Sequence, residues 1–260
     1  PSDSELQQLT KQWGEKGLSF LPFKTENPDL YIMAEAVAYH MFKNYKNEIY
    51  DPTLDTILIP YNKSFGSIHI NLHLANLLGK DRNAVVHEIK SGFQTMYLAE
   101  GDFVMYNKRE FFVTKIEINE KYFGDLPQPA SNKLNRFGIL MNADGSESGA
   151  ISAIHVKGPS NILELTSGEA LSEVDDILRQ ASHIVTLSEV DTGEPLVLSS
   201  SGELNALEFG YAMTVHKSQG SEWRKVWFIL CRQHKAMLSR EILYTGMTRA
   251  REHLTMIYTA

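Results

Sequence analysis

The last fifty residues contain the pattern that most limits what this chain can fold into. An apolar stretch, Tyr211–Val215, runs directly into a polar cluster, His216–Glu222, and a second apolar stretch follows at Lys225–Leu230. A helical pattern over Ser239–Arg249, whose first residue suits an N-cap, precedes a last apolar stretch, His253–Tyr258. Short buried strands that alternate with helices favour a parallel sheet, so we expect a layered α/β fold.

The first eighty residues predict the same architecture. Apolar side chains recur at helical spacing over residues 29–48. The short β-branched run Thr56–Ile59 has the length of a buried parallel strand. Residues 67–78 predict a second helix, closed by Gly79, so we expect a helix, a strand and a helix in this order.

The middle of the chain has a different pattern. From about residue 100, short β-like runs such as Phe111–Val113 and Ile184–Leu187 are separated by turn residues, which indicates a small barrel or sandwich. One acidic helix is expected between Gly168 and Gln180. The predicted domains are therefore an α/β domain made of residues 1–99 and 206–260, and a mostly β insertion made of residues 100–205.

Composition excludes several classes of protein. Apolar residues make up 43% of the 260 residues, which is enough for a sizeable core and argues against a disordered chain. The single cysteine, Cys231, rules out a disulfide framework within the chain, which fits a reducing, cytoplasmic location. No apolar stretch approaches twenty residues, so we expect no membrane span.

The distribution of charge sets the C-terminal segment apart. The whole chain carries a net charge of −7, which argues against a protein that simply coats nucleic acid. Residues 206–260 contain eight lysines and arginines and four acids, a net charge of +4, so the other residues carry −11. The segment with the α/β pattern is therefore the electropositive part of an acidic protein.

The polar cluster after the first C-terminal strand has the groups of a phosphate site. Ligands of open α/β sheets bind beyond the carboxyl ends of strands, where we expect this cluster to lie. Gly220 lets a backbone approach a ligand closely, and Glu222 can accept a hydrogen bond from a ribose hydroxyl. Four further side chains supply donors suited to phosphate oxygens: Thr214, His216, Lys217 and Gln219.

A second chemical motif lies on the predicted helix before the last strand. Arg249 is flanked by the small residues Gly246 and Ala250, which permit tight packing while the guanidinium reaches across an interface. A guanidinium in such a place can neutralise the charge that develops on a transferring γ-phosphoryl group.

Together these two segments resemble motifs V and VI of superfamily 1 helicases. The sequences TVHKSQGSE (214–222) and LYTGMTRAR (243–251) are most similar to the RecD-like branch. A weaker resemblance covers residues 54–105, including Ile59–Lys63 and Gly101–Met105. The resemblance implies a RecA-like parallel-sheet fold, the second motor domain of the helicase, which has no P-loop and carries a small SH3-like β-barrel insertion.

The resemblance also implies a role for each motif residue. Arg249 would be the catalytic arginine finger, and Gly220 and Glu222 would face ATP. Thr214, His216, Lys217 and Gln219 would contact the DNA backbone or couple it to the nucleotide. Tyr61, Asn62 and Lys63 would also lie along the DNA path. Movement in the 5′-to-3′ direction and a role in replication or repair come from the resemblance alone.

Two elements of a complete ATPase are absent from the sequence. There is no G-x-x-x-x-G-K-[ST] loop and no apolar strand that ends in Asp-Glu to hold Mg²⁺. We therefore expect ATP and Mg²⁺ to be held by an N-terminal P-loop domain of the same protein, and this chain alone to hydrolyse nothing. No resident metal is expected, since His69 and His73 have no further ligands nearby in sequence.

Other interpretations of the same residues stay open. His216, Lys217 or Arg249 taken singly is typical of a solvated surface, and only their shared context favours function. Trp227 lies inside an apolar strand and is expected in the core, whereas Trp223 is more open and could stack on a base. The chain could also be a non-catalytic module of helicase ancestry that binds nucleic acid or protein. An unrelated α/β nucleotide-binding enzyme would need a phosphate loop of its own.

Overall fold

The computed structural model divides the chain into two compact units. The first comprises Pro1–Leu77 and Phe209–Ala260, and the second comprises Leu78–Glu208. The structure describes residues 17–23, 30–62, 66–91, 94–120, 139–141, 147–151, 180–232 and 238–259. The acidic helix predicted between Gly168 and Gln180 lies outside the described residues except for Gln180. Lys63 also lies outside them.

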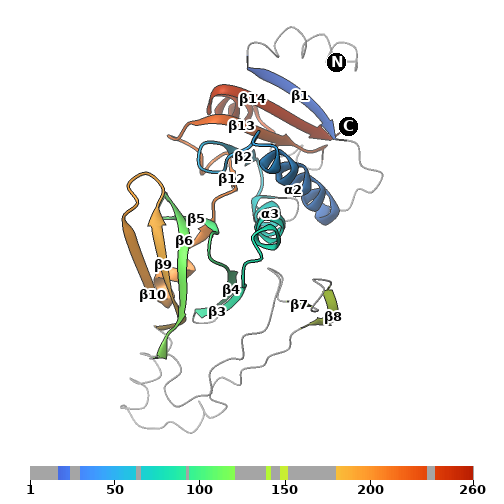
Figure 1. Ribbon diagram of the computed structural model, residues 1–260. Helices are drawn as coiled ribbons and strands as arrows, with labels where there is room; N and C mark the ends of the chain where they lie inside the picture. The colour runs from blue at the N-terminus through green and yellow to red at the C-terminus, as the bar shows by residue number, and fades with distance from the viewer. Residues whose placement is uncertain are drawn as a thin grey trace, which may run out of the picture. The chain divides into compact units, whose positions relative to one another are not determined.

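The first unit is built on a parallel sheet of five strands (Figure 1). The strand order is β1-β14-β13-β2-β12, and every neighbouring pair is parallel. The strands are β1 (Leu18–Phe23), β2 (Thr56–Ile59), β12 (Ala212–Thr214), β13 (Trp223–Leu230) and β14 (Ala250–Thr259). The expected α/β parallel-sheet class is therefore confirmed.

Helices cover both faces of this sheet. α2 (Leu30–Lys46) lies on the face that carries Trp227, and α7 (Arg240–Met247) packs on the face that carries Phe228. Ser239 caps α7, because its side chain accepts the backbone N–H of Ile242, as the sequence predicts. α3 (Ser67–Asp81) does not end at Gly79 as expected. Gly79 is buried inside the helix, where its backbone bonds offset its low helix propensity.

A buried ion pair fixes the amino ends of two central strands. Asp55 has a fully buried side chain, and its two carboxylate oxygens accept Nε and Nη2 of Arg224 at 2.9 and 2.8 Å. The same carboxylate accepts the backbone N–H groups of Asp51 and Lys225. Asp55 directly precedes β2 and Arg224 is the second residue of β13, so this one carboxylate sets how the two strands start.

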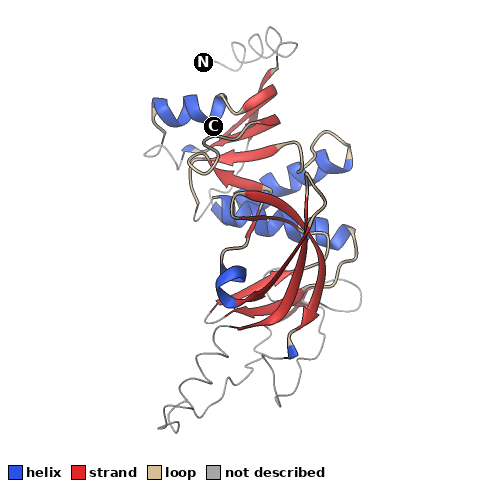
Figure 2. Ribbon diagram, turned by 90° about the vertical axis from the view of Figure 1, so that its left-hand side faces the viewer, coloured by secondary structure: helices blue, strands red, loops and turns tan. Residues whose placement is uncertain are grey.

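The second unit is dominated by an antiparallel sheet. Its strand order is β11-β5-β6-β9-β3-β4, with β10 also paired to β9. The two longest strands, with ten residues each, curve as they cross the unit (Figure 2). The strands are β3 (His87–Ser91), β4 (Gln94–Leu98), β5 (Phe103–Tyr106), β6 (Arg109–Ile118), β9 (Gln180–Glu189), β10 (Pro195–Ser200) and β11 (Glu208–Phe209).

Two smaller elements complete the second unit. β7 (Ile139–Met141) and β8 (Glu147–Ile151) form a separate antiparallel pair, and α6 (Ser201–Asn205) is a short helix with a capping box. The expected β-rich middle of the chain is thus present, and its assignment as an SH3-like insertion over residues 100–205 remains a prediction. The strands β3 and β4 lie before that range but belong to this sheet. None of the helices in the described ranges is long and apolar enough to cross a membrane.

The second unit contains a histidine pair in which His183 is buried and His87 is half-buried. The rings of His87 and His183 meet edge to face with centroids 5.7 Å apart, and Ser182 Oγ lies 2.9 Å from His183 Nδ1. Burial, with a smaller contribution from His87, lowers the pKa of His183 to about 4. His183 is therefore neutral at pH 7, which suits its position on the central strand β9.

The ion pair of the first unit predicts a large cost for Asp55→Asn. The amide leaves the Arg224 guanidinium without its counter-charge, so we expect a loss of about 2–3 kcal/mol in the free energy of unfolding. Urea unfolding followed by tryptophan fluorescence measures this, since Trp223 and Trp227 lie in the same sheet. The matched control is Glu222→Gln, which removes an exposed carboxylate–arginine pair and should cost less than about 0.5 kcal/mol. Equal costs for the two variants would contradict the assignment.

The lowered pKa of His183 predicts acid sensitivity of the antiparallel sheet. Between about pH 6.5 and pH 4 the unfolded state binds more protons than the folded state, so stability falls as the pH falls through this window. The full shift corresponds to roughly 3 kcal/mol. Amide hydrogen exchange of β6 and β9, corrected for its intrinsic pH dependence, should show this loss in the wild type and a clearly smaller one in His183→Gln. An unchanged slope in the variant would show that other groups cause it.

Candidate functional site

Two of the predicted site segments meet at the carboxyl end of the parallel sheet, called here the carboxyl edge. β2 and β12 are neighbours, with Thr214 opposite Ile59, and the backbone N–H of Val215 donates to the carbonyl of Ile59. The residues that follow the two strands therefore emerge at the same edge. Four of these residues, Tyr61, Asn62, His216 and Lys217, have exposed side chains.

The turn after β12 is held by two buried hydroxyl residues. Ser218 is fully buried; its backbone N–H donates to the Thr214 carbonyl and its Oγ donates to the Val215 carbonyl at 2.7 Å. Thr214 is itself buried, and its Oγ1 accepts the backbone N–H of Lys217. The exposed members of the cluster are thus His216, Lys217 and Gln219, while Thr214 and Ser218 shape the turn beneath them. Ser218 received no role from the sequence.

The neighbouring Tyr61–Asn62 segment is fixed by the start of α3. The backbone N–H groups of Ser67 and Ile68 donate to the carbonyls of Tyr61 and Asn62, and Ser67 Oγ donates to Asn62 Oδ1 at 2.8 Å. A Cβ atom on Gly66 would come within 2.5 Å of the Asn62 backbone, so only glycine permits this approach. The position of Asn62 is therefore built into the fold.

A buried asparagine holds the chain that leads into β12. Asn71, on α3, donates from Nδ2 to the carbonyls of Phe209 and Ala212, and its Oδ1 accepts the backbone N–H of Ala212 at 2.7 Å. These bonds satisfy the whole amide of a side chain that is 7% exposed. Asn71 thus positions the strand from which the polar cluster emerges.

The last residues of the polar cluster, Ser221 and Glu222, lie at the opposite end of the sheet, called here the amino edge. β12 ends at Thr214, whereas β13 begins at Trp223, beside the first residue of β14. Residues 215–222, the 215–222 connection, therefore run from the carboxyl edge to the amino edge. The expectation that the whole cluster sits at a strand's carboxyl end is wrong for Ser221 and Glu222, because the parallel crossover returns the chain to the start of β13.

Arg249 is fixed at this amino edge by the connection itself. Its carbonyl accepts the backbone N–H of Trp223, and its Nη1 donates to the Ser221 carbonyl at 3.1 Å. Nε donates to the Thr245 carbonyl and Nη2 to Thr248 Oγ1. The structure thus brings together the arginine and the end of the polar cluster, two groups that the sequence predicts for one nucleotide site.

Glu222 and Gly220 lie open to solvent on the same connection. Glu222 accepts Nε of Arg251 at 3.2 Å, and both side chains are more than half exposed. Gly220 has a φ of +89°, a conformation that L side chains rarely adopt, and no atom lies within 4 Å of where its Cβ would be. The glycine is required by its backbone conformation, and the space beside it is free for a ligand.

The small residues of the second motif serve close packing, as expected. A Cβ on Gly246 would lie 2.6 Å from the ring of Phe228, so α7 can approach β13 only with glycine here. This contact sets the distance between β13 and α7, the helix that carries Thr245 and directly precedes Arg249. By contrast, Trp223 is 7% exposed and packs in the core with Phe228, so the suggestion that it stacks on a base is wrong. Trp227 is in the core, as predicted.

No metal centre accompanies these edges in the part of the chain that the structure describes. There is no group of three or more His, Cys, Asp or Glu side chains that could hold an ion within those ranges. Cys231 is buried. The chemistry available at the amino edge is hydrogen bonding and positive charge, and at the carboxyl edge it is a row of exposed donors.

Comparison with known proteins concerns mainly the segment that carries both edges. Residues 209–257 match the UvrD-like helicase C-terminal domain. The ATP-dependent RecD2 DNA helicase of Deinococcus radiodurans is 48% identical over 63 residues, which are 24% of this chain and 9% of that protein. The RecBCD enzyme subunit RecD of Haemophilus influenzae is 45% identical over 51 residues, 20% of this chain and 8% of that protein.

The solved structures add little to this relationship. The crystal structure of Pif1 helicase from Candida albicans aligns with 87% of this chain and over 53% of its own length, at 11% identity. Its TM-score of 0.38 is too low to support an argument about function. The sequence matches cover less than a tenth of each RecD relative, so they describe the C-terminal segment and not a whole protein.

Proposed function

We propose that this chain, whose C-terminal segment resembles that of RecD-like superfamily 1 helicases, is the second motor domain of an ATP-dependent DNA helicase. ATP would bind between the amino edge and an N-terminal P-loop domain of the same protein. Single-stranded DNA would bind along the carboxyl edge. Travel in the 5′-to-3′ direction, a role in replication or repair and a cytoplasmic location belong to the same proposal.

One observation carries this proposal: the 215–222 connection joins the two edges directly. It starts with the exposed donors His216 and Lys217 at the carboxyl edge and ends at Ser221 and Glu222 beside Arg249. Backbone bonds run along this short segment, from Ser218 to Thr214, from Gln219 to His216 and from Ser221 to Ser218, so a shift at one end would be carried toward the other. This is the property that coupling of hydrolysis to movement requires.

At the amino edge each proposed residue has a distinct task. The guanidinium of Arg249 uses three donors for local bonds, so further donors remain for phosphate oxygens. Gly220 would let the nucleotide approach the backbone, and Glu222 would receive the ribose hydroxyl. The phosphate loop and the ligands of Mg²⁺ would come from the P-loop domain, so this chain supplies half of the site and is inactive alone.

At the carboxyl edge the proposed contacts are to the DNA backbone. Lys217 supplies a charge, and His216, Gln219 and Asn62 supply further hydrogen-bond donors that are exposed in this structure. Such contacts hold single strands without reading their sequence, which suits a translocating motor. Thr214 would act indirectly by shaping the turn, and Tyr61, 38% exposed, offers a ring for stacking beside Asn62. Lys63 remains part of the proposal from the sequence alone.

The arginine assignment predicts a severe loss of hydrolysis in the protein that includes its P-loop domain. Arg249→Ala should lower the kcat of DNA-stimulated ATPase by about 10³-fold or more, as expected for an arginine finger. Arg240→Ala, at the exposed start of the same helix, is the matched control and should change kcat less than about twofold. Near-normal ATP hydrolysis by Arg249→Ala, or ATP hydrolysis by the 260-residue chain alone, would contradict the shared-site proposal.

The carboxyl-edge assignment predicts a salt-dependent loss of DNA binding. Lys217→Ala in the 260-residue chain should weaken binding of an oligothymidylate and reduce the slope of log K against log salt by about 0.7, the value for one phosphate contact on a single strand. Fluorescence anisotropy at several salt concentrations measures both. Lys80→Ala, an exposed lysine of α3, is the control. If both variants reduce the slope equally, the charge acts through the overall field and the edge is not the binding path.

A further inference from the structure

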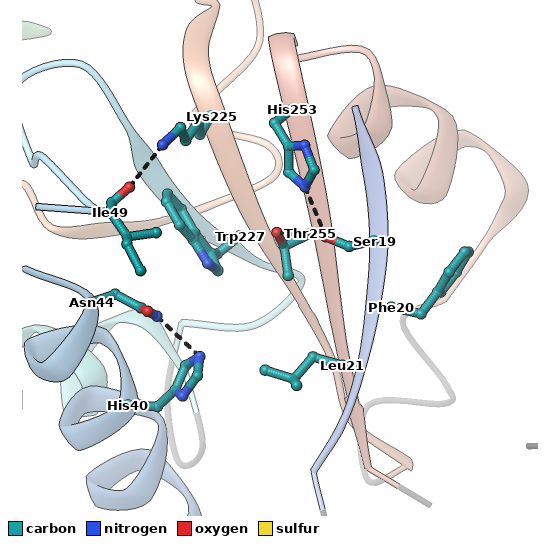
Figure 3. Close-up of a pocket in the computed structure, with 10 residues that line it drawn as sticks. All are labelled: Ser19, Phe20, Leu21, His40, Asn44, Ile49, Lys225, Trp227, His253 and Thr255. Carbon is teal, nitrogen blue, oxygen red and sulfur yellow. Dashed lines mark hydrogen bonds between the residues drawn. The ribbon is translucent and has the colours of Figure 1, made fainter. Parts of the chain in front are cut away.

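A cavity of about 430 Å³ opens in the first unit, on the face of the parallel sheet that α2 covers. It lies between the C-terminal part of α2 and the face of the sheet formed by β1, β14 and β13 (Figure 3). Its volume falls within the range of small-molecule sites, about 300–1,000 Å³. Ten residues line it: Ser19, Phe20, Leu21, His40, Asn44, Ile49, Lys225, Trp227, His253 and Thr255. None of them belongs to the proposed ATP or DNA site.

The strands place polar side chains where a helix-covered sheet normally carries apolar ones. Ser19 is paired with Thr255, and Thr255 with Trp227, so these three residues lie on one face. His253 and its partner Lys225 precede them by two positions and share that face. Trp227 is buried there, as a core position requires, and pairs with Ile57 on β2, but toward β14 and β1 its neighbours carry hydroxyls and an imidazole. Local departures from the apolar pattern of this kind mark functional positions.

The polar groups of the cavity are already ordered by hydrogen bonds. Ser19 Oγ lies 2.7 Å from His253 Nε2 and 3.1 Å from Thr255 Oγ1. On the α2 side, Asn44 Nδ2 lies 3.0 Å from His40 Nε2. The two groups face each other across the cavity, with Trp227 and Leu21 between them, whereas Phe20 points away (Figure 3). A ligand would meet polar groups whose positions are already set.

The electrostatics of the cavity favour an anion. Lys225 stands at its rim, where Nζ donates to the Ile49 carbonyl, and none of the ten lining residues is acidic. Burial and then Lys225 lower the pKa of His253, and burial and then Lys43 lower the pKa of His40. The carboxylate of Asp55, which accepts the backbone N–H of Lys225, is already paired with Arg224. Among the described residues that line it, the cavity thus has a positive charge and no carboxylate.

We propose that this cavity binds a small phosphate-bearing ligand. The phosphate group would lie against Lys225, Ser19 and His253, which combine a point charge with oriented neutral donors. Leu21 and Trp227 would contact the remainder of the ligand. The donor set fits free phosphate and the phosphate of a mononucleotide equally well. The proposal concerns binding by the first unit alone and stands apart from the proposed motor function.

The test is an NMR titration of the 260-residue chain with inorganic phosphate, at constant pH and with chloride replaced to keep ionic strength constant. The indole N–H of Trp227 and the ring C–H of His253 should shift together and saturate with one Kd. Lys225→Gln and Ser19→Ala should each weaken binding by about tenfold, the loss of one charge-assisted or oriented hydrogen bond. Two variants are used because each side chain also has a structural contact. Lys80→Gln is the control and should leave the Kd within about twofold.

Two further ligands distinguish the possible sources of the phosphate. Adenosine monophosphate that binds more tightly than inorganic phosphate would identify a mononucleotide, and equal or weaker binding would identify the free anion. Adenosine should not compete with either. Adenosine binding as tight as that of the monophosphate, unsaturable shifts, or an unchanged Kd in both cavity variants would overturn the proposal. ATPase activity is not measured, so failure of the motor proposal would not affect this result.

Discussion

The ion pair between Asp55 and Arg224 is the constraint on which the functional end of the parallel sheet depends. A single buried carboxylate receives the guanidinium and two backbone N–H groups, and so fixes where β2 and β13 begin. Trp223 precedes Arg224 and donates its backbone N–H to the Arg249 carbonyl, which places the arginine beside Ser221. The Asp55–Arg224 ion pair in the interior thereby determines where the guanidinium of Arg249, the proposed arginine finger, lies at the surface.

The two edges also differ in how they are ordered. The carboxyl edge is held from below by hydrogen bonds, with Ser218, Thr214 and Asn71 fully committed to backbone groups. The amino edge is held by the Asp55–Arg224 ion pair and the bond from Trp223 to Arg249, and Gly246 lets α7 pack closely against Phe228. At the carboxyl edge the backbone is therefore maintained mainly by Ser218, Thr214 and Asn71 and not by the exposed side chains that are proposed to bind DNA. This division of work explains why motifs of this kind contain small and hydroxyl residues as well as charged ones.

Much of this arrangement follows from local sequence patterns, and the remainder does not. The strands Thr56–Ile59 and Lys225–Leu230, the Ser239 cap and the core position of Trp227 are evident because burial and capping act over a few residues. The pairing of Asp55 with Arg224 joins positions 169 residues apart, which no periodicity reveals. The division of the polar cluster between two edges depends on the direction of a crossover. The polar face around Ser19 required knowledge that β1 lies beside β14.

The strand order has a consequence for how the protein is made. β1 pairs with β14, and β2 pairs with β13 and β12, so strands from the start of the chain find their neighbours only at its end. During synthesis the early strands must wait, unpaired, while the whole second unit emerges from the ribosome and can fold. Loss of β14 would leave β1 without its partner and β13 with one unpaired edge. Such a chain would be a substrate for chaperones or a seed for aggregation.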